Sequence, residues 1–278
     1  MILANHGIIS SSGGSLPLLL DTYSGAIVAY SLRKLNTAYT GYAIRVRRSS
    51  DDTSQDIGFK ADGTLDTTAL TTFVGANNGF VSIWYDQSTN GYNLSQSTAA
   101  NQLRVVYNGS LDLLNGKVAL TSNYNSAQVG FMQTTSFASS YSQTTNFHIG
   151  SHVAAATKYL WYSLNPGPLY RQECYQEATN LLSTYAGVNM RLSYTPSIST
   201  QRIIYALFNS TSSKLAINNN TGTSGNTGTG AITGLSINTL DSIYNPASYT
   251  QEFIMFQGDK DTDRTNINTN INSFYTIY

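Results

Sequence analysis

The feature that most restricts the fold is a set of short apolar runs with a period of two, each ended by a polar turn. It is clearest between residues 29 and 96. From Ala43 to Arg47 apolar and basic residues alternate, so Ile44 and Val46 share one face, as in a half-buried strand. Val81 to Tyr85 (VSIWY) is rich in β-forming residues and predicts a central strand. A chain built from such runs folds as sheets rather than as a helical bundle.

The same stretch predicts one helix and one tight reversal. Residues 66–74 (DTTALTTFV) have apolar residues at helical spacing, with Asp66 as the N-cap and Gly75 after the last turn. The Asn90-Gly91 pair is the strongest reversal signal in the chain. The predicted order here is therefore a strand, a helix, a second strand and then a reversal of the chain.

Further short β-like runs continue to the C-terminus, separated by turns rich in Gly, Asn and Ser. They lie at residues 104–107, 117–120, 147–153, 159–162, 188–194, 201–208, 214–217, 235–237 and 252–256. Their number and spacing predict an all-β, two-sheet sandwich.

The two ends of the chain differ from this pattern. A C-terminal helix is predicted, capped by Asp261 or Thr262, from one apolar face made by Ile267, Ile271, Phe274 and Tyr278. A docking arm is predicted at the N-terminus, followed by a Ser/Gly linker, from the apolar residues Ile2, Leu3, Ile8 and Ile9. The alternative for this segment is a strand of its own sandwich. The expected division is an arm at 1–20 and a single domain at 21–278.

Composition restricts the partners. Charged residues make up only 11% of the chain, the net charge is zero, and there are 20 tyrosines. Zero net charge supplies no field to attract nucleic acid, whereas low charge with many tyrosines favours contact between protein chains, so a homo-oligomer is expected. No apolar stretch approaches the roughly 20 residues of a membrane span, and the N-terminus lacks the pattern of a secretory signal. We therefore expect the protein to assemble in a cytoplasm and not to insert into a membrane.

Charged residues also cluster locally. Three arginines are followed at once by three aspartates: Arg45, Arg47, Arg48, Asp51, Asp52 and Asp56. Internal pairing is favoured over a nucleic-acid surface, and a polar turn at residues 49–56 is favoured over a Ca²⁺ site. The only cysteine, Cys174, cannot form an intrachain disulfide and is expected to be buried. No metal, cofactor or catalytic residue is predicted.

Sugar binding needs aromatic faces together with amide or carboxylate groups, and two clusters supply them. The predicted ligand-binding residues are Trp84, Tyr85, Asp86, Asn90 and Tyr92 in the first cluster, and Trp161, Tyr162 and Tyr170, near Tyr159 and Tyr175, in the second. The alternative for both clusters is packing in the core or at its rim. Glycoside hydrolysis would need Glu252 or Asp86 beside a second carboxylate.

The segments RRSSDDTSQDIGF and WYDQSTNGYNLSQ carry a resemblance. They resemble a concanavalin-like (LamG-like) jelly-roll domain of virion proteins from phages of Bacteroidetes-type hosts. More distantly they resemble the catalytic sandwich of fungal-type α-L-arabinofuranosidases. In that second family the turn is typically DQSGNGN, whereas this chain has Thr89 and Tyr92 at two of its positions.

The first resemblance implies a phage virion component: a fibre, spike or decoration protein, released by lysis. Such a protein would attach to capsid or tail proteins through its N-terminal arm and display a lectin-like domain to host polysaccharide. A trimer is expected by analogy with fibres. Two alternatives stay open: a purely structural virion protein, and a glycoside hydrolase of the arabinofuranosidase type.

Overall fold

The computed structural model describes residues 17–122, 130–153, 158–164, 167, 171–177, 180–195, 197–238 and 247–278. The predicted arm residues Ile2, Leu3, Ile8 and Ile9, and Tyr170, lie outside these ranges. Within them no helix combines the length and apolar character that crossing a membrane requires.

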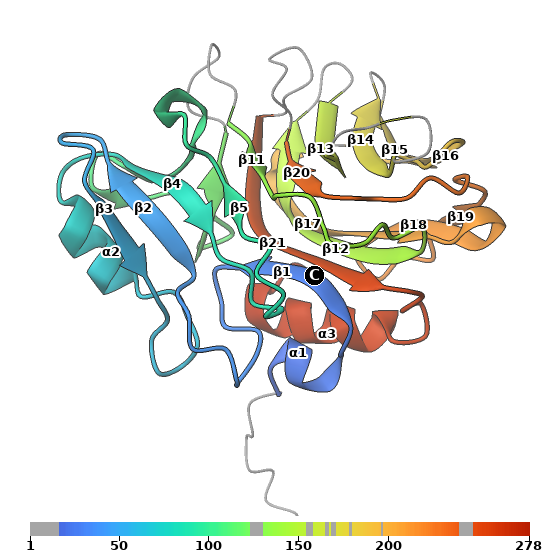
Figure 1. Cartoon of the computed structure of the whole chain (residues 1–278), viewed down its shortest axis with the longest axis horizontal. Coiled ribbons are helices and arrows are strands. Elements are labelled where there is room, and N and C mark those ends of the chain that lie inside the picture. The colour runs from blue at the N-terminus through green and yellow to red at the C-terminus, as the bar shows by residue number, and fades with distance from the viewer. Residues whose placement is uncertain are drawn as a thin grey trace, which may run out of the picture.

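The centre of the molecule is an antiparallel sheet of long strands (Figure 1). It contains β1 (Ala26–Ser31), β12 (Thr144–Val153), β17 (Ser197–Phe208), β18 (Ser213–Ile217), the short β19 (Thr223–Gly225) and β21 (Ala247–Gln257). β12 lies between β17 and β21, so Phe147 faces Tyr205 on one side and Ile254 on the other. β12, β17, β18 and β21 overlap the runs predicted at residues 147–153, 201–208, 214–217 and 252–256, whereas β1 and β19 match none of the predicted runs.

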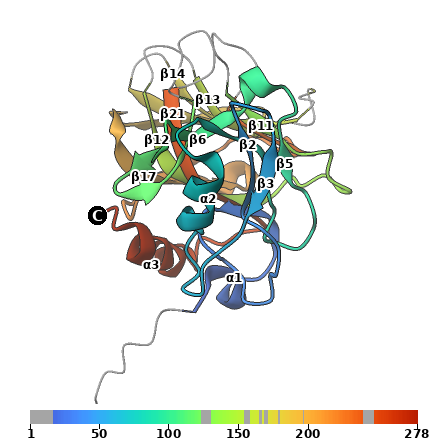
Figure 2. The same cartoon turned by 90° about the vertical axis from the view of Figure 1, so that its left-hand side faces the viewer.

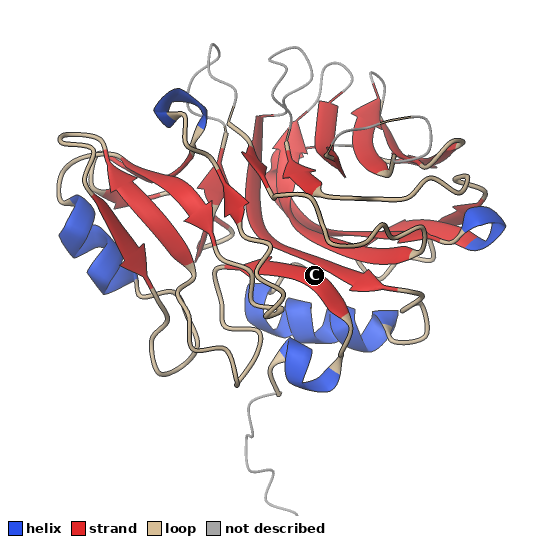
Figure 3. Ribbon diagram, viewed as in Figure 1, coloured by secondary structure: helices blue, strands red, loops and turns tan. Residues whose placement is uncertain are grey.

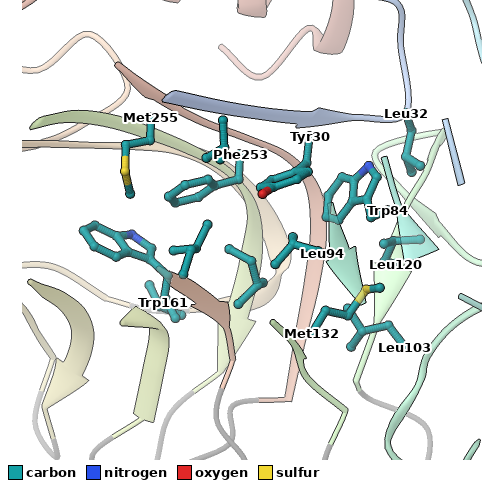
Figure 4. Packing of buried hydrophobic residues seen from close by; sticks show 14 of the residues in the cluster. Tyr30, Leu32, Trp84, Leu94, Leu103, Leu120, Met132, Trp161, Phe253 and Met255 are labelled. Carbon is teal, nitrogen blue, oxygen red and sulfur yellow. The ribbon is translucent and has the colours of Figure 1, made fainter. Parts of the chain in front are cut away.

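A second layer packs on one face of this sheet. Its strands are β11 (Met132–Gln133), β13 (Lys158–Ser163), β14 (Glu173–Glu177), β15 (Leu181–Tyr185), β16 (Asn189–Ser193) and β20 (Leu235–Ile237). Trp161 of β13 joins the layers, with ring centroids 5.5 Å from Phe208 and 5.7 Å from Phe253. Figure 4 shows this core, with Trp161 and Trp84 at opposite ends of one buried cluster.

The N-terminal half adds a group of shorter strands that closes the sandwich at one side (Figure 2). They are β2 (Ile44–Arg48), β3 (Ser54–Ile57), β4 (Gly79–Trp84), β5 (Leu94–Ser95), β6 (Leu103–Tyr107), β7 (Ser110–Leu111) and β10 (Leu120–Thr121). β10 pairs with both β6 and β21, and β5 pairs with both β4 and β11. The hydrogen-bonded network therefore runs from one layer to the other and makes the sandwich almost a barrel.

The helices lie outside the sheets (Figure 3). α1 (Leu19–Thr22) and α3 (Arg264–Tyr275) cover the outer face of the central sheet, where Ile267, Ile271 and Tyr275 are buried. The predicted caps of α3 are wrong, because its N-cap is Asp263 and the Asp263 side chain makes no capping bond. Tyr278 was predicted on the buried face of this helix, but it is 53% exposed. Tyr275 is the residue that is buried there instead.

The predicted helix before β4 is confirmed as α2 (Thr67–Val74). The Asp66 carboxylate accepts a hydrogen bond from the amide of Ala69 at 2.9 Å, which satisfies one of the free amides of the first turn. Gly75 follows the helix with φ of 60°, a conformation that favours glycine. The remaining elements are the hairpin β8 (Leu113–Leu114) and β9 (Lys117–Val118), and the 3₁₀ turns η1 (Ala99–Asn101) and η2 (Ser210–Ser212).

The predicted internal pairing of the basic cluster is confirmed. The ion pairs are Arg45–Asp56 at 2.8 Å, Arg47–Asp52 at 2.6 Å and Arg48–Asp51 at 2.6 Å. Cys174 is fully buried, as expected for a small apolar residue. The predicted all-β sandwich with a C-terminal helix is therefore the observed fold, and the structure shows that its strands pair antiparallel.

Candidate functional site

The first predicted sugar-binding cluster is mostly interior. Trp84 is fully buried, with its ring centroid 5.9 Å from that of Tyr30, so no sugar can stack on it without opening the core. Tyr92 packs against Phe137 at 4.8 Å. Tyr85 is half-buried, and its hydroxyl donates to Asp56 at 2.7 Å. The binding role predicted for Trp84 is therefore corrected to a core role.

Asp86 and Asn90 hold the turn that follows β4. The Asp86 carboxylate accepts hydrogen bonds from the amides of Ala29 and Ser88, both at 2.9 Å, and of Tyr92 at 3.2 Å. Burial raises the pKa of Asp86, and the backbone donors oppose that rise. The Asn90 amide donates to the carbonyls of Ala26 and Ile27 at 3.0 and 2.9 Å. Both residues therefore fix the turn to β1; the Asp86 side chain is buried, whereas Asn90 stays exposed.

Asp86→Ala is expected to lower the free energy of unfolding by about 2 kcal/mol, because it leaves buried amides without acceptors. Urea unfolding measures this loss of stability. The control is Tyr85→Phe, a variant next to Asp86. Binding at the surface described below should be unchanged. Loss of ligand binding by a variant that is stable and folded would instead place Asp86 in a binding site.

The second predicted cluster is divided by a β-bulge in β13. Residues three apart in a regular strand face opposite ways, but the register with β14 shifts between Tyr159 and Trp161. Tyr159 and Tyr162 can therefore both face outward, while Trp161 is fully buried. The ligand role predicted for Trp161 is corrected to packing between the layers, whereas Tyr162 keeps an outward position.

β13 and β14 lie in the layer farther from α3 (Figure 1). The bulge in β13 creates a surface there that we call the outer tyrosine face. It consists of Tyr159, Tyr162, Glu173, Tyr175 and Glu177, with Tyr185, Asn189 and Arg191 from the next two strands. The ring centroid of Tyr159 lies 5.9 Å from that of Tyr162 and 5.3 Å from that of Tyr175. Three tyrosines from two strands thus form one continuous aromatic group.

Polar groups surround these rings. The Tyr175 hydroxyl donates to the Asn189 side chain at 2.7 Å. Glu177 accepts hydrogen bonds from Ser183 at 2.8 Å and from Arg191 at 2.9 Å. Amide, carboxylate and guanidinium groups therefore adjoin the aromatic group.

Glu173 lies at the more buried end of the same face. Its side chain is only 4% exposed and accepts a hydrogen bond from Arg171 at 2.7 Å. Burial raises the pKa of Glu173, and Arg171 opposes that rise. The Arg171 guanidinium also lies over the Tyr185 ring at 4.8 Å. Glu173 thus holds a proton more readily than an ordinary glutamate.

Other groups with reactive side chains lie elsewhere. Glu252 is fully buried in an ion pair with Arg33, and the buried Asp86 carboxylate is occupied by backbone amides, so neither belongs to the outer tyrosine face. His148 and His152 are buried between the layers. Among the described residues no three His, Cys, Asp or Glu side chains gather as a metal site would require.

Sequence reasoning identified Tyr159, Tyr162 and Tyr175 of this face but missed Tyr185 and the two glutamates. The sequence ECYQE could have shown the glutamates, because Glu173, Tyr175 and Glu177 alternate with Cys174 and Gln176 and therefore share one face of the strand. A stacking surface with hydrogen-bonding groups at its edge is the chemistry that recognises a sugar ring.

Comparisons with known proteins agree with this chemistry. The family described as "Alpha-L-arabinofuranosidase B, catalytic" matches residues 21–180, which is more than half of the 278-residue chain. Among curated proteins no sequence matches.

Solved structures show the same fold at low sequence identity. A mutant of a GH54 α-L-arabinofuranosidase soaked with 4-nitrophenyl α-L-arabinofuranoside superposes with a TM-score of 0.67 at 16% identity, covering 88% of this chain. An arabinofuranosidase complexed with arabinofuranosyl-α-1,2-xylobiose gives 0.65, also at 16% identity and with 88% of this chain covered. The match spans only 62% of the length of each of these two proteins. The binding domain of Paraclostridial Mosquitocidal Protein 1 gives 0.50 at 14% identity, over 69% of this chain and 49% of that one.

Proposed function

The chain belongs to the family of the alpha-L-arabinofuranosidase B catalytic domain, and from that premise we propose that it binds glycans carrying α-L-arabinofuranosyl groups on the outer tyrosine face. The supporting observation is the contact of Tyr159 with both Tyr162 and Tyr175, beside two glutamates on one strand. Aromatic faces stack on the apolar side of a sugar, while carboxylate and amide groups accept its hydroxyls.

The arrangement supports binding because its stacking group is already ordered. Tyr175 is held through its hydroxyl by Asn189. Side chains held in their bound conformation lose less entropy when a ligand arrives. Desolvation raises the pKa of Tyr175 to about 12, so its hydroxyl stays neutral and can donate and accept.

The second candidate function is hydrolysis of the same glycans. It is favoured by the family and by Glu173, whose raised pKa suits a general acid. The Glu173 side chain is 4% exposed, so this role requires it to turn outward when substrate binds, while Glu177 would act as the base or nucleophile. Glu173 and Glu177 are four positions apart on one strand, which places their Cα atoms about 13 Å apart. Hydrolysis needs carboxyl groups about 5–10 Å apart, so both side chains must lean toward Tyr175. Glu177 leans that way, because its partner Ser183 is the residue that faces Tyr175.

Binding is tested with an array of arabinofuranosyl oligosaccharides and matched xylosyl and glucosyl ones. Tyr159→Ala and Tyr175→Ala are each expected to weaken binding at least about tenfold, through loss of a stacking ring. Tyr107→Ala is the control, because Tyr107 is 52% exposed on β6, outside this face. Equal binding by the wild type and both variants would reject the outer tyrosine face as the site.

Hydrolysis is tested separately with 4-nitrophenyl α-L-arabinofuranoside. We expect the Glu173→Gln and Glu177→Gln variants to lose turnover while keeping glycan affinity, because amides keep the shape but cannot transfer the proton or attack. If the wild type binds the array but shows no turnover, the chain is a binding domain and not a hydrolase. Turnover that persists in both variants would place the reaction elsewhere.

The predicted place of the protein in a phage particle and its predicted oligomeric state stay predictions. The reported matches give no support to a virion role, to attachment through the N-terminal arm or to a trimer. Sedimentation of the purified chain would test self-association directly.

A further inference from the structure

A cavity of about 160 Å³ lies on the side of the molecule that carries α3, away from the outer tyrosine face. Its apolar lining comes from Leu32, Leu65 and Val118 and from the rings of Phe274 and Tyr275. An engineered apolar cavity of similar size, roughly 150 Å³, binds a single benzene ring. The space therefore fits one six-membered ring.

Two lysines also line the cavity, Lys60 from the segment before α2 and Lys117 from β9, together with Thr64, Thr67 and Gly116. The Lys60 ammonium donates to the Thr67 hydroxyl at 3.2 Å, and the Lys117 ammonium lies over the Phe274 ring at 4.6 Å. Among the described residues, neither ammonium has a carboxylate within ion-pair distance. An anion at this position would therefore meet two cations that no acid in the described chain pairs with.

The nearest acids are already engaged. Asp62 accepts hydrogen bonds from the amide and hydroxyl of Thr64, at 2.9 and 2.7 Å. Glu252, behind Tyr275, is neutralised by Arg33. Asp62 stays ionised, because the hydrogen bonds from Thr64 lower the pKa of Asp62 and the charge of Lys60 helps to lower it. Counting Asp62 as one negative charge, the two lysines still leave an excess of one positive charge at the cavity.

The walls are fixed before any ligand arrives. Bridges join Arg33 to Thr64 and Phe59 to Leu65 on the Lys60 side. On the Lys117 side, the Gln251 amide donates to the carbonyls of Leu114, Lys117 and Val118 at 3.1, 3.2 and 3.2 Å. The Asn115 amide ties the same hairpin to the end of α3, through the carbonyl of Tyr275 at 3.0 Å. Fixed walls reduce the entropy lost on binding.

We propose that this cavity binds a carboxylate carried on a single six-membered ring, with the ring against the apolar floor and the carboxylate between Lys60 and Lys117. Charge-assisted hydrogen bonds to an ammonium are stronger than neutral ones, and the ring gains by leaving water. Two sources offer this chemistry: a free aromatic acid, and a uronic acid unit of a polysaccharide. The site is separate from the outer tyrosine face and does not depend on the proposed function.

Calorimetric titration of the full chain with benzoate and with methyl glucuronoside distinguishes the two sources. At least one of them should bind saturably, and benzyl alcohol should bind at least about tenfold more weakly, since it lacks the charge. Binding should weaken as salt is raised. Tighter binding of benzoate indicates a free aromatic acid, and tighter binding of the glucuronoside indicates a uronate.

Lys60→Met and Lys117→Met keep the apolar stem and remove the cation, so each should weaken binding by at least about fivefold. Lys34→Met is the matched control, because Lys34 lines a neighbouring hollow but not this cavity. Absence of saturable binding of both acids to the folded wild type would overturn the proposal. Equal affinity for benzyl alcohol, or unchanged affinity in both lysine variants, would do so too.

Discussion

Replacing Glu252 with glutamine is expected to lower the free energy of unfolding by about 3–5 kcal/mol, the usual cost of breaking a buried ion pair. Glu252 is fully buried, and its Oε2 accepts from Arg33 Nε at 2.8 Å and from the Ser31 hydroxyl at 2.6 Å. Arg33 also donates to Asn270 on α3 at 3.0 Å, so the pair connects β1, β21 and the helix. The variant would leave the guanidinium charge buried without a counter-charge.

The double variant Arg33→Met/Glu252→Leu separates the cost of an orphaned charge from the net contribution of the pair. Replacing both partners by apolar residues is often neutral, so the double variant should lose much less stability than Glu252→Gln. Asp263→Asn breaks the partly exposed Lys260–Asp263 pair, 3.7 Å apart, and should cost under about 1 kcal/mol. If Glu252→Gln unfolds at the same urea concentration as wild type, the pair does not hold these elements together.

Stability should also fall steeply as the pH is lowered from about 7 to 5. Burial lowers the pKa of His148 to about 3 and the pKa of His152 to about 4, against 6.5 for a free imidazole. Below pH 6.5 the two histidines therefore bind protons in the unfolded chain but stay neutral in the folded chain. At about 1.4 kcal/mol for each pH unit and each group, the two histidines together remove roughly 4 kcal/mol by pH 5.

The surroundings explain why both rings stay neutral. His148 Nε2 lies 3.3 Å from the Thr250 hydroxyl, and its Nδ1 has no partner. His152 contacts Gln176 at 3.5 Å and hydrogen-bonds the Tyr194 hydroxyl, while the nearby Arg202 further disfavours a second positive charge. No described carboxylate contacts either ring to stabilise an imidazolium.

Urea unfolding at several pH values, together with NMR titration of the imidazoles, measures this effect. Burial raises the pKa of Asp86 and of Glu173, so their protonation favours the folded state in acid and offsets part of the loss. His148→Met isolates one histidine, because it fills the site without a titrating group and should remove about half of the acid sensitivity. Titration of either imidazole near pH 6.5 in the folded protein would contradict the prediction.

Local patterns determined the positions of most elements. The strand at Ile44–Arg48, the helix at Thr67–Val74 and the helix at Arg264–Tyr275 follow from period two, capping chemistry and helical spacing. The pairing of the basic cluster also followed from sequence, because its partners lie within eleven residues of one another. Each of these features depends on contacts that a short segment makes with itself.

The roles of the aromatic residues could not be read in this way. Period two says that alternate residues share a face, but not which face another layer will cover. Trp84 and Trp161 were predicted to bind sugar and are core residues, since each lies on the face that the opposite layer buries. The outward position of Tyr159 and Tyr162 depends on a bulge in β13, which is defined only by its register with β14.

The sequence by itself therefore determined an antiparallel sandwich with a closing helix, because alternation and capping are local properties of the chain. Tertiary structure alone decided that Glu252 and Glu173 are buried while Glu177 stays partly exposed. Glu252 lies 219 residues from Arg33 along the chain and becomes structural only when β1 and β21 pair. Glu173 and Glu177 stand beside the tyrosines because a strand places alternate residues on one face and the neighbouring layer buries the other.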